Sequence, residues 1–148
     1  MPTIFDRSVH DALVTRIRQL RPDSARKWGQ MNAATMQAHL IAGMRMTLGT
    51  LQVTPKKTPL ANPLGRWLVI HSPFPWPKGA PTGDELKDPP SQDFEAEREE
   101  LLRLLGVVNQ RAQSESWPAH PAFGPLSARD WGVLVWRHTD HHLRQFGV

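Results

Sequence analysis

The chain of 148 residues contains no cysteine. This absence excludes disulfide bonds and thiolate-ligated zinc, so any bound metal would have to use imidazole, carboxylate or backbone oxygen ligands. A chain without disulfides also fits a reducing compartment. The sequence has no apolar run long enough to span a bilayer, and residues 1–7 have no apolar signal core. We therefore expect a cytoplasmic protein with no membrane partner.

Several functional classes lack their sequence signatures. The net charge is +4, but the basic residues are scattered and interleaved with acidic ones, and no nucleic-acid reading motif occurs, so we expect no nucleic-acid partner. There is no glycine-rich phosphate loop, because segment 79–83 contains proline and lacks the Lys-Thr end of a P-loop. The loop serines Ser72 and Ser91 have no motif around them that would supply a base, so no serine nucleophile is predicted.

The sequence does contain strong helical periodicity. Apolar residues recur at three- to four-residue spacing in four segments, which predict long helices over about Asp6–Gln19, Asn32–Leu51, Gln92–Gln113 and Ala128–Phe146. N-cap signals support two of these starts: Asn32 or Thr35 before the second helix, and Ser127 with Asp130, a variant capping box, before the last. No strand pattern or internal repeat is found. The expected fold is therefore all-α, a four-helix bundle in a single domain over residues 1–148.

A proline-rich crossover (residues 54–90) separates the second and third long helices. Nine of the fourteen prolines fall there, at positions 55, 59, 63, 73, 75, 77, 81, 89 and 90. A short helix is predicted within it, with Asn62 as N-cap and Pro63 at the first helical position. Phe74 and Trp76 indicate an ordered crossover packed on the bundle rather than a disordered linker.

Three of the seven histidines lie in the last eleven residues. His138 and His142 are four residues apart, so on a helix they share one face. With about 100° per residue, that face also carries apolar residues and should point to the core, whereas His141 lies on its flank. Leaving a buried ring nitrogen unpaired costs about 1–3 kcal/mol, and a shared metal would satisfy one nitrogen of each ring. Hydrogen-bonded structural histidines are the alternative.

A third histidine, His39, is predicted on the second long helix beside the small residues Ala42 and Gly43. Glycine inside a helix costs about 1 kcal/mol relative to alanine, which indicates a need for space, either for a metal with its water or substrate or for close helix packing. A set made of His39, His138 and His142 would leave at least one coordination position open, as reactive metal sites do. Imidazole suits Zn, Ni, Fe or Cu.

Other residues are weaker candidates for the site. His120, in a proline-bounded loop before the last helix, could reach the metal as an acid, a base or a substrate contact, or could simply bond to backbone; the same holds for His71. Gln145, on the predicted ligand face, could orient a ligand or cap the helix end. Arg137 and Arg144 are explained by the dipole at the C-terminal end of the last helix.

One histidine followed by a later His-x-x-x-His in a small helical chain resembles the DinB/YfiT-like metalloenzyme superfamily. Four stretches are similar to one branch of it, described only as a domain of unknown function: residues 26–31, 35–40, 120–126 and 141–148. The resemblance covers nearly the whole chain. It implies a four-helix bundle whose second and fourth helices supply His39, His138 and His142 to a divalent transition metal, Zn, Ni or Fe.

The resemblance also implies classes of reaction. Some relatives are transferases or isomerases that use a low-molecular-weight thiol, others are called hydrolases, and dimers are common among them. We therefore expect a metal-dependent enzyme acting on a small-molecule substrate, either a thiol-dependent transferase or a hydrolase, and the resemblance is compatible with a homodimer. The alternative is a non-catalytic metal- or ligand-binding helical bundle.

Overall fold

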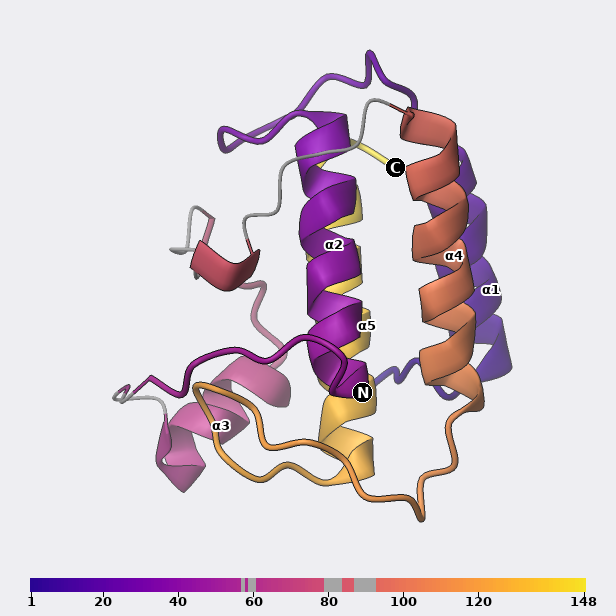
Figure 1. Cartoon of the computed structure of the whole chain (residues 1–148). Coiled ribbons are helices and arrows are strands. Elements are labelled where there is room, and N and C mark those ends of the chain that lie inside the picture. The colour runs from indigo at the N-terminus through magenta and orange to yellow at the C-terminus, as the bar shows by residue number, and fades with distance from the viewer. Residues whose placement is uncertain (57, 59–60, 79–83, 87–92) are drawn as a thin grey trace.

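Four long helices form the body of the molecule (Figure 1). A computed structural model of the chain describes residues 1–56, 58, 61–78, 84–86 and 93–148. The long helices are α1 (Arg7–Arg18), α2 (Ala33–Leu48), α4 (Phe94–Gln110) and α5 (Ala128–Gln145). Both α1 and α2 contact both α4 and α5, so the four close around a common core. The predicted all-α bundle is confirmed, and the residues that the structure describes contain no strand.

The helix starts follow the predicted capping signals. The side chain of Asn32 accepts a backbone hydrogen bond at the start of α2, and Asn62 does the same for α3 (Pro63–Ile70). Ser127 and Asp130 form a reciprocal capping box at the start of α5. These caps satisfy backbone N–H groups that have no partner inside the helix, which is why each helix begins where it does.

Two helix ends come earlier than periodicity predicted. The second long helix, α2, ends at Leu48 because Gly49 takes a left-handed conformation with φ of 78° and turns the chain away. The third, α4, ends at Gln110, after which the backbone becomes extended. Its predicted start at Gln92 lies outside the described residues, and the observed helix begins at Phe94 with Asp93 as its N-cap.

The core lies between the four long helices and is almost entirely aliphatic. Its fully buried side chains include Leu13, Ile17, Met36, Leu40, Met44, Leu101, Leu105 and Leu143. A smaller apolar cluster lies where α3 packs on α5 and contains Ile70, Phe123, Trp131, Val133 and Leu134. Burying these side chains holds α2 and α5 side by side, which sets the distance between the histidines that they carry.

A buried arginine ties the crossover to α5. Only 8% of Arg137 is exposed, and its guanidinium donates hydrogen bonds to three backbone carbonyl oxygens, those of Ile70 at 3.2 Å, Ser72 at 2.5 Å and Phe74 at 2.6 Å. The interpretation of Arg137 as a group that merely complements the helix dipole is therefore wrong. It is a fixed contact between α5 and residues 70–74.

The two crossover aromatics behave differently. The indole nitrogen of Trp76 donates to the carbonyl oxygen of Val69 at 2.8 Å, and its ring packs on the smaller apolar cluster. Phe74 is 70% exposed, so the prediction that it packs on the bundle is wrong. A short 3-10 turn, η2 (Asp84–Leu86), lies against α2.

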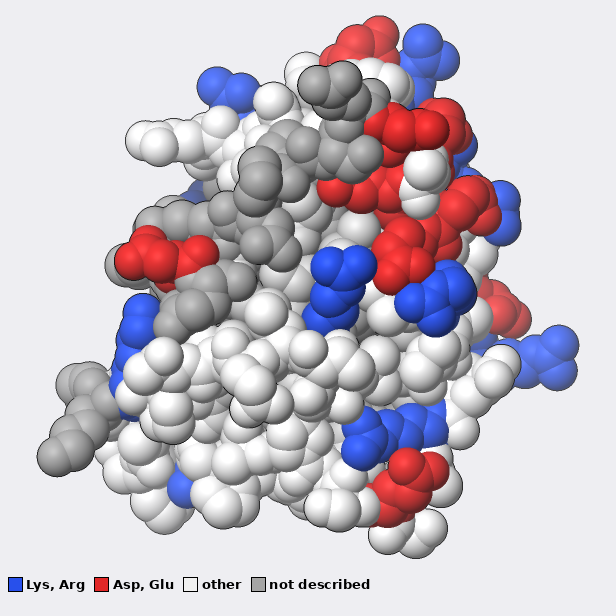
Figure 2. Space-filling model, in the orientation of Figure 1, with Lys and Arg blue, Asp and Glu red and all other residues white. Residues whose placement is uncertain are grey.

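The surface carries its charges unevenly. Figure 2 shows carboxylates gathered over the N-terminal half of α4, where Glu95, Glu97, Glu99 and Glu100 lie. Negative charge is favoured there because the helix dipole is positive at its N-terminal end. Within the described residues, none of the helices is both long and apolar enough to cross a membrane.

Candidate metal centre

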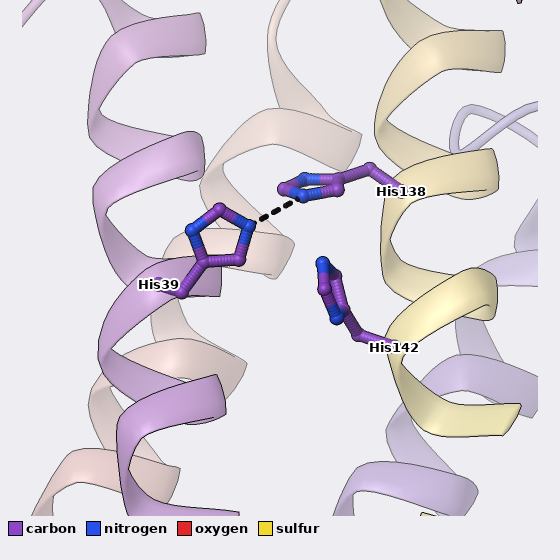
Figure 3. Close-up of side chains that lie close together, drawn as sticks. All are labelled: His39, His138 and His142. Carbon is purple, nitrogen blue, oxygen red and sulfur yellow. Dashed lines mark hydrogen bonds between the residues drawn. The ribbon is translucent and has the colours of Figure 1, made fainter. Parts of the chain in front are cut away.

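Three imidazole rings converge between α2 and α5 (Figure 3). His39 comes from α2, and His138 and His142 come from successive turns of α5. One nitrogen of each ring lies within 4.8 Å of one nitrogen of each of the others. The Nε2 atoms of His39 and His138 are 2.8 Å apart, and the centroids of all three ring pairs are separated by 4.8 Å. The three side chains that the sequence assigned to one site do lie together.

Two of the rings are held by contacts on their outer nitrogens. The Nδ1 of His39 lies 3.1 Å from the carbonyl oxygen of Leu86, and the Nδ1 of His142 lies 2.9 Å from Oε1 of Gln145. Gln145 is itself oriented, because its Nε2 donates to the carbonyl oxygen of Trp28 at 2.9 Å. These oxygens only accept, so Nδ1 carries the proton in both rings and Nε2 keeps its lone pair. Both lone pairs then face the centre of the cluster.

At a separation of 2.8 Å, only one hydrogen can lie between the Nε2 atoms of His39 and His138. Because His39 carries its proton on Nδ1, the hydrogen between the two Nε2 atoms must come from His138. A divalent cation could take the place of that proton and be held by nitrogen lone pairs from all three rings. Deprotonated, neutral imidazole is the form in which histidine binds metals, and contacts to the other ring nitrogen are typical of such ligands.

Burial keeps the three imidazoles neutral. It lowers the pKa of His39, although the Leu86 contact opposes the shift. It lowers the pKa of His142 to about 3, with repulsion from His39 adding to the effect and the Gln145 bond opposing it. The pKa of His138 lies well below its usual value, through burial first and then through repulsion from His142 and His39. His39 and His142 therefore present unprotonated Nε2 atoms at neutral pH, and the neutral His138 ring can present one when its single proton moves to Nδ1.

Gly43 of α2 leaves space for the His138 ring. A Cβ at this position would lie 3.3 Å from Cε1 and 3.4 Å from Nδ1 of His138. The sequence left two explanations open for this glycine, and the group found in the space beside it is the His138 ring of α5. The small residue thus lets His138 reach the position where it meets His39.

Two loop histidines lie outside the cluster. The Nδ1 of His120 accepts the backbone N–H of Ala122 at 3.1 Å, its ring stacks on Phe123 with centroids 4.5 Å apart, and burial lowers its pKa to about 4. The Nε2 of His71 lies 2.7 Å from Oδ1 of Asp130, the capping-box residue of α5. Backbone bonding, one of the two roles considered for His120, is therefore what the structure records, and His71 fixes α3 to α5.

His141 remains on the flank of α5, as the helical wheel predicted. Its ring centroid lies 5.1 Å from that of His142, 5.8 Å from that of Trp28 and 6.0 Å from that of Trp76. The group of three metal-capable histidines does not include it. His141 and the two tryptophans instead cover the outer side of the cluster.

Sequence reasoning missed the groups that orient the cluster from outside. Two of them are backbone carbonyls, those of Leu86 and Trp28, and a carbonyl leaves no signature in a sequence. The third is Gly29, which has φ of 78° and whose Cβ, if it had one, would lie 2.5 Å from Nε2 of Gln145. Its position next to Trp28 in a predicted loop gave no sign that α5 would approach it.

Gly29→Ala is expected to weaken metal binding about 10–100-fold, the usual effect of losing an outer contact to a ligand. The added methyl group would displace Gln145 and release the ring of His142. Gly49→Ala is the matched control, because Gly49 also has φ of 78° but a Cβ there would meet only Pro118, at 4.0 Å. Both variants should lose about 1–2 kcal/mol from the left-handed backbone. Titration calorimetry with Zn²⁺ separates the two effects, and equal affinities in both variants would contradict the role given to Gln145.

Taken with the fold, this geometry defines an all-α bundle with a buried cluster of three histidines that could hold a metal ion. The model of a family described as a protein of unknown function (DUF1569) matches residues 5–147. The chain belongs to this family, which confirms the expected membership of a family of unknown function. No curated protein and no solved structure matches the chain.

Proposed function

We propose that His39, His138 and His142 bind a divalent transition metal, and that the protein is a DinB/YfiT-like metal-dependent enzyme acting on a small molecule. The observation that carries the proposal is the convergence of three neutral imidazoles, two of them with Nδ1 fixed by an oxygen acceptor. Imidazole ligands suit Zn, Ni or Fe. Three protein ligands leave at least one coordination position open, as in catalytic rather than structural sites.

The residues of the chain have distinct parts in this proposal. A bound divalent metal supplies Lewis acidity toward a substrate, a water or a low-molecular-weight thiol. The carbonyl of Leu86 and the side chain of Gln145 keep the metal-facing nitrogens of two rings unprotonated. The amide of Gln145 is occupied by His142 and by the Trp28 carbonyl, so we assign it to orienting its neighbour rather than to proton transfer.

We assign no catalytic proton transfer to His120. Its Nδ1 is used by a backbone N–H, and its ring is stacked in the loop before α5. A reaction at the cluster would therefore depend on the metal and on the reactant it activates, through either hydrolysis or transfer involving a thiol. The thiol-dependent transferases and hydrolases that the chain resembles would likewise rely on a metal-activated reactant.

A non-catalytic metal-binding bundle is the second candidate. It is favoured by the hydrogen bonds that already satisfy ring nitrogens of all three histidines, which is how structural histidines are retained in a core. In that case the metal would add stability without turnover. The two candidates share the metal site and differ only in chemistry.

Elemental analysis followed by an activity screen tests both candidates. The purified protein is expected to carry, or to accept, close to one equivalent of Zn, Ni or Fe. The loaded protein is then incubated with simple esters and amides, with and without an added low-molecular-weight thiol. Turnover without thiol supports a hydrolase, turnover only with thiol supports a transferase, and stable metal binding without turnover supports the binding module. A protein that cannot be loaded would overturn all three assignments.

A further inference from the structure

A cavity of about 750 Å³ lies beside the histidine cluster. The described residues of its wall come from the C-terminal half of α5 and residues 147–148 after it, residues 72–76 and 78 of the crossover, Lys27 and Trp28 from the loop before α2, and Met1. This volume falls within the range of about 300–1,000 Å³ that is typical of small-molecule sites. None of the three histidines of the cluster lines the cavity, so the cavity is distinct from the candidate metal centre.

The cavity and the cluster share a wall. Trp76 and His141 both line the cavity. The ring of Trp76 lies 6.0 Å from that of His138, and the ring of His141 lies 5.1 Å from that of His142, measured between centroids. A molecule in the cavity would thus be separated from the metal-capable histidines by a single layer of rings.

The cavity wall carries an excess of positive charge. Among the described residues of the lining, four side chains are basic, namely Lys27, Lys78, Arg137 and Arg144, and one is acidic, that of Asp140. That carboxylate is already engaged, because its Oδ1 lies 2.7 Å from Nη1 of Arg16 and its Oδ2 lies 3.7 Å from Nε of Arg144. Within the part of the chain that the structure describes, no ion pair joins Lys27, Lys78 or Arg137 to a carboxylate.

Arg137 makes this excess unusual. Arg137 is a buried residue, 8% exposed as a whole, and the hydrogen-bond partners of its guanidinium are three neutral carbonyl oxygens. Buried charges are ordinarily paired with an opposite charge, because removing an ion from water is unfavourable. Carbonyl oxygens satisfy the hydrogen bonds of Arg137 but leave its charge in place. Asp140 is near enough to oppose the lowering of the pKa of Arg137 by burial, but its carboxylate also faces Arg16 and Arg144. An anion in the cavity would provide further countercharge.

The rest of the wall is aromatic. Trp28, Trp76 and Trp136 line the cavity. Lys78 lies with its Nζ 4.6 Å from the ring centroid of Trp28, and the guanidinium carbon of Arg137 lies 5.6 Å from that of Trp76. Flat faces next to cations suit a ligand that combines an apolar or aromatic part with a negative charge.

We infer that this cavity binds a small organic anion, whose carboxylate or phosphate group is held by Lys27 and Lys78 and balances the charge of Arg137, and whose apolar part lies against the tryptophans. The inference deepens the proposed function and rests on it in one respect, namely that the anion is a substrate or co-substrate of the adjoining metal site. Binding of the anion itself requires no metal. The two proposals can therefore fail separately.

Titration calorimetry on the metal-free protein tests the inference with four probes: phenyl phosphate, phenylacetate, inorganic phosphate and benzyl alcohol. At least one of the two aromatic anions is expected to bind at least about 10-fold more tightly than neutral benzyl alcohol and than inorganic phosphate, since charge-assisted hydrogen bonds contribute more than neutral ones. Which of the two binds identifies the anionic group. Equal binding of benzyl alcohol would overturn the inference, and equal binding of inorganic phosphate would reduce the site to an adventitious ion site and overturn it as well.

Charge-removing variants locate the site. Lys27→Met and Lys78→Met keep an apolar stem and are each expected to weaken binding of the preferred probe about 10-fold, with a larger loss in the double variant. Lys56→Met is the matched control, because Lys56 is an exposed lysine that does not line the cavity, and it should bind as the wild type does. Wild-type affinity in the double variant would contradict the inference.

His39→Ala separates the cavity from the metal site. The metal-free variant, shown to be folded by circular dichroism, should bind the aromatic anion with wild-type affinity, because His39 does not line the cavity. Loss of binding would mean that the anion sits on the histidine cluster and would overturn the inference. Failure to load a metal would overturn the proposed function and leave the anion result standing.

Discussion

Alanine at His39, His138 or His142 should abolish the rise in melting temperature that a divalent metal produces, whereas alanine at His141 should leave that rise intact. A ligand that binds only the folded state stabilises it by RT ln(1 + [L]/Kd), about 4 kcal/mol at a concentration a thousand times Kd. Each of the three residues supplies one of the nitrogens that lie within 4.8 Å of one another, so removing any of them leaves two. Calorimetric melting of the metal-free protein, before and after addition of Zn²⁺ or Ni²⁺, measures the effect.

His141 is a demanding control because it is also a partly buried imidazole on α5, with its ring 5.1 Å from that of His142. Its loss changes the histidine content equally but removes no member of the cluster. Each variant is compared with its own metal-free state, so that lost packing does not count as lost metal binding. A His39→Ala protein that gains as much melting temperature from metal as the wild type would show that the cluster is not the metal site.

The histidine cluster shows how far sequence spacing can carry a prediction. His138 and His142 could be paired because a helix fixes residues four apart on one face, whatever the surrounding fold. His39 could be joined to them only through the resemblance and through its small neighbours. The sequence left two explanations open for Gly43. The ring that this glycine faces depends on how α2 and α5 are packed, which spacing alone does not give.

Contacts between distant segments lay beyond prediction. The carbonyls of Leu86 and Trp28 orient the cluster from segments far from α5 in sequence, and backbone groups are identical in every residue. Apolar periodicity alone predicted that the second helix would extend to Leu51, whereas the left-handed Gly49 ends α2 at Leu48. Arg137 was misinterpreted for a related reason. Its place near the end of a helix fits a dipole contact, and only the path of the crossover shows where its guanidinium goes.

Arg137→Met should lower the free energy of unfolding by about 2–4 kcal/mol, the largest effect expected for any change outside the apolar core. A hydrogen bond to a charged group contributes about 1.5–3 kcal/mol, and three carbonyl oxygens would lose theirs. Relief from burying an unpaired charge offsets part of the loss, which keeps the sum well below the total of the three bonds. Urea denaturation followed by circular dichroism gives the value, and the slope should change little if the folded core is intact.

Arg144→Met is the matched control for this prediction. Arg144 lies on the same helix, but its side chain is 64% exposed and it approaches Asp140 at 3.7 Å, so its loss should cost about 0–1 kcal/mol. Amide exchange distinguishes a lost crossover contact from general destabilisation: in Arg137→Met, exchange should speed up for the amides of residues 70–76 more than for those of α1 and α4. Equal losses in the two variants, or exchange that rises uniformly, would contradict the role of Arg137 in fixing the crossover. Because that crossover supplies part of the cavity wall, a loosened segment in Arg137→Met should also lose the selectivity for an aromatic anion over inorganic phosphate.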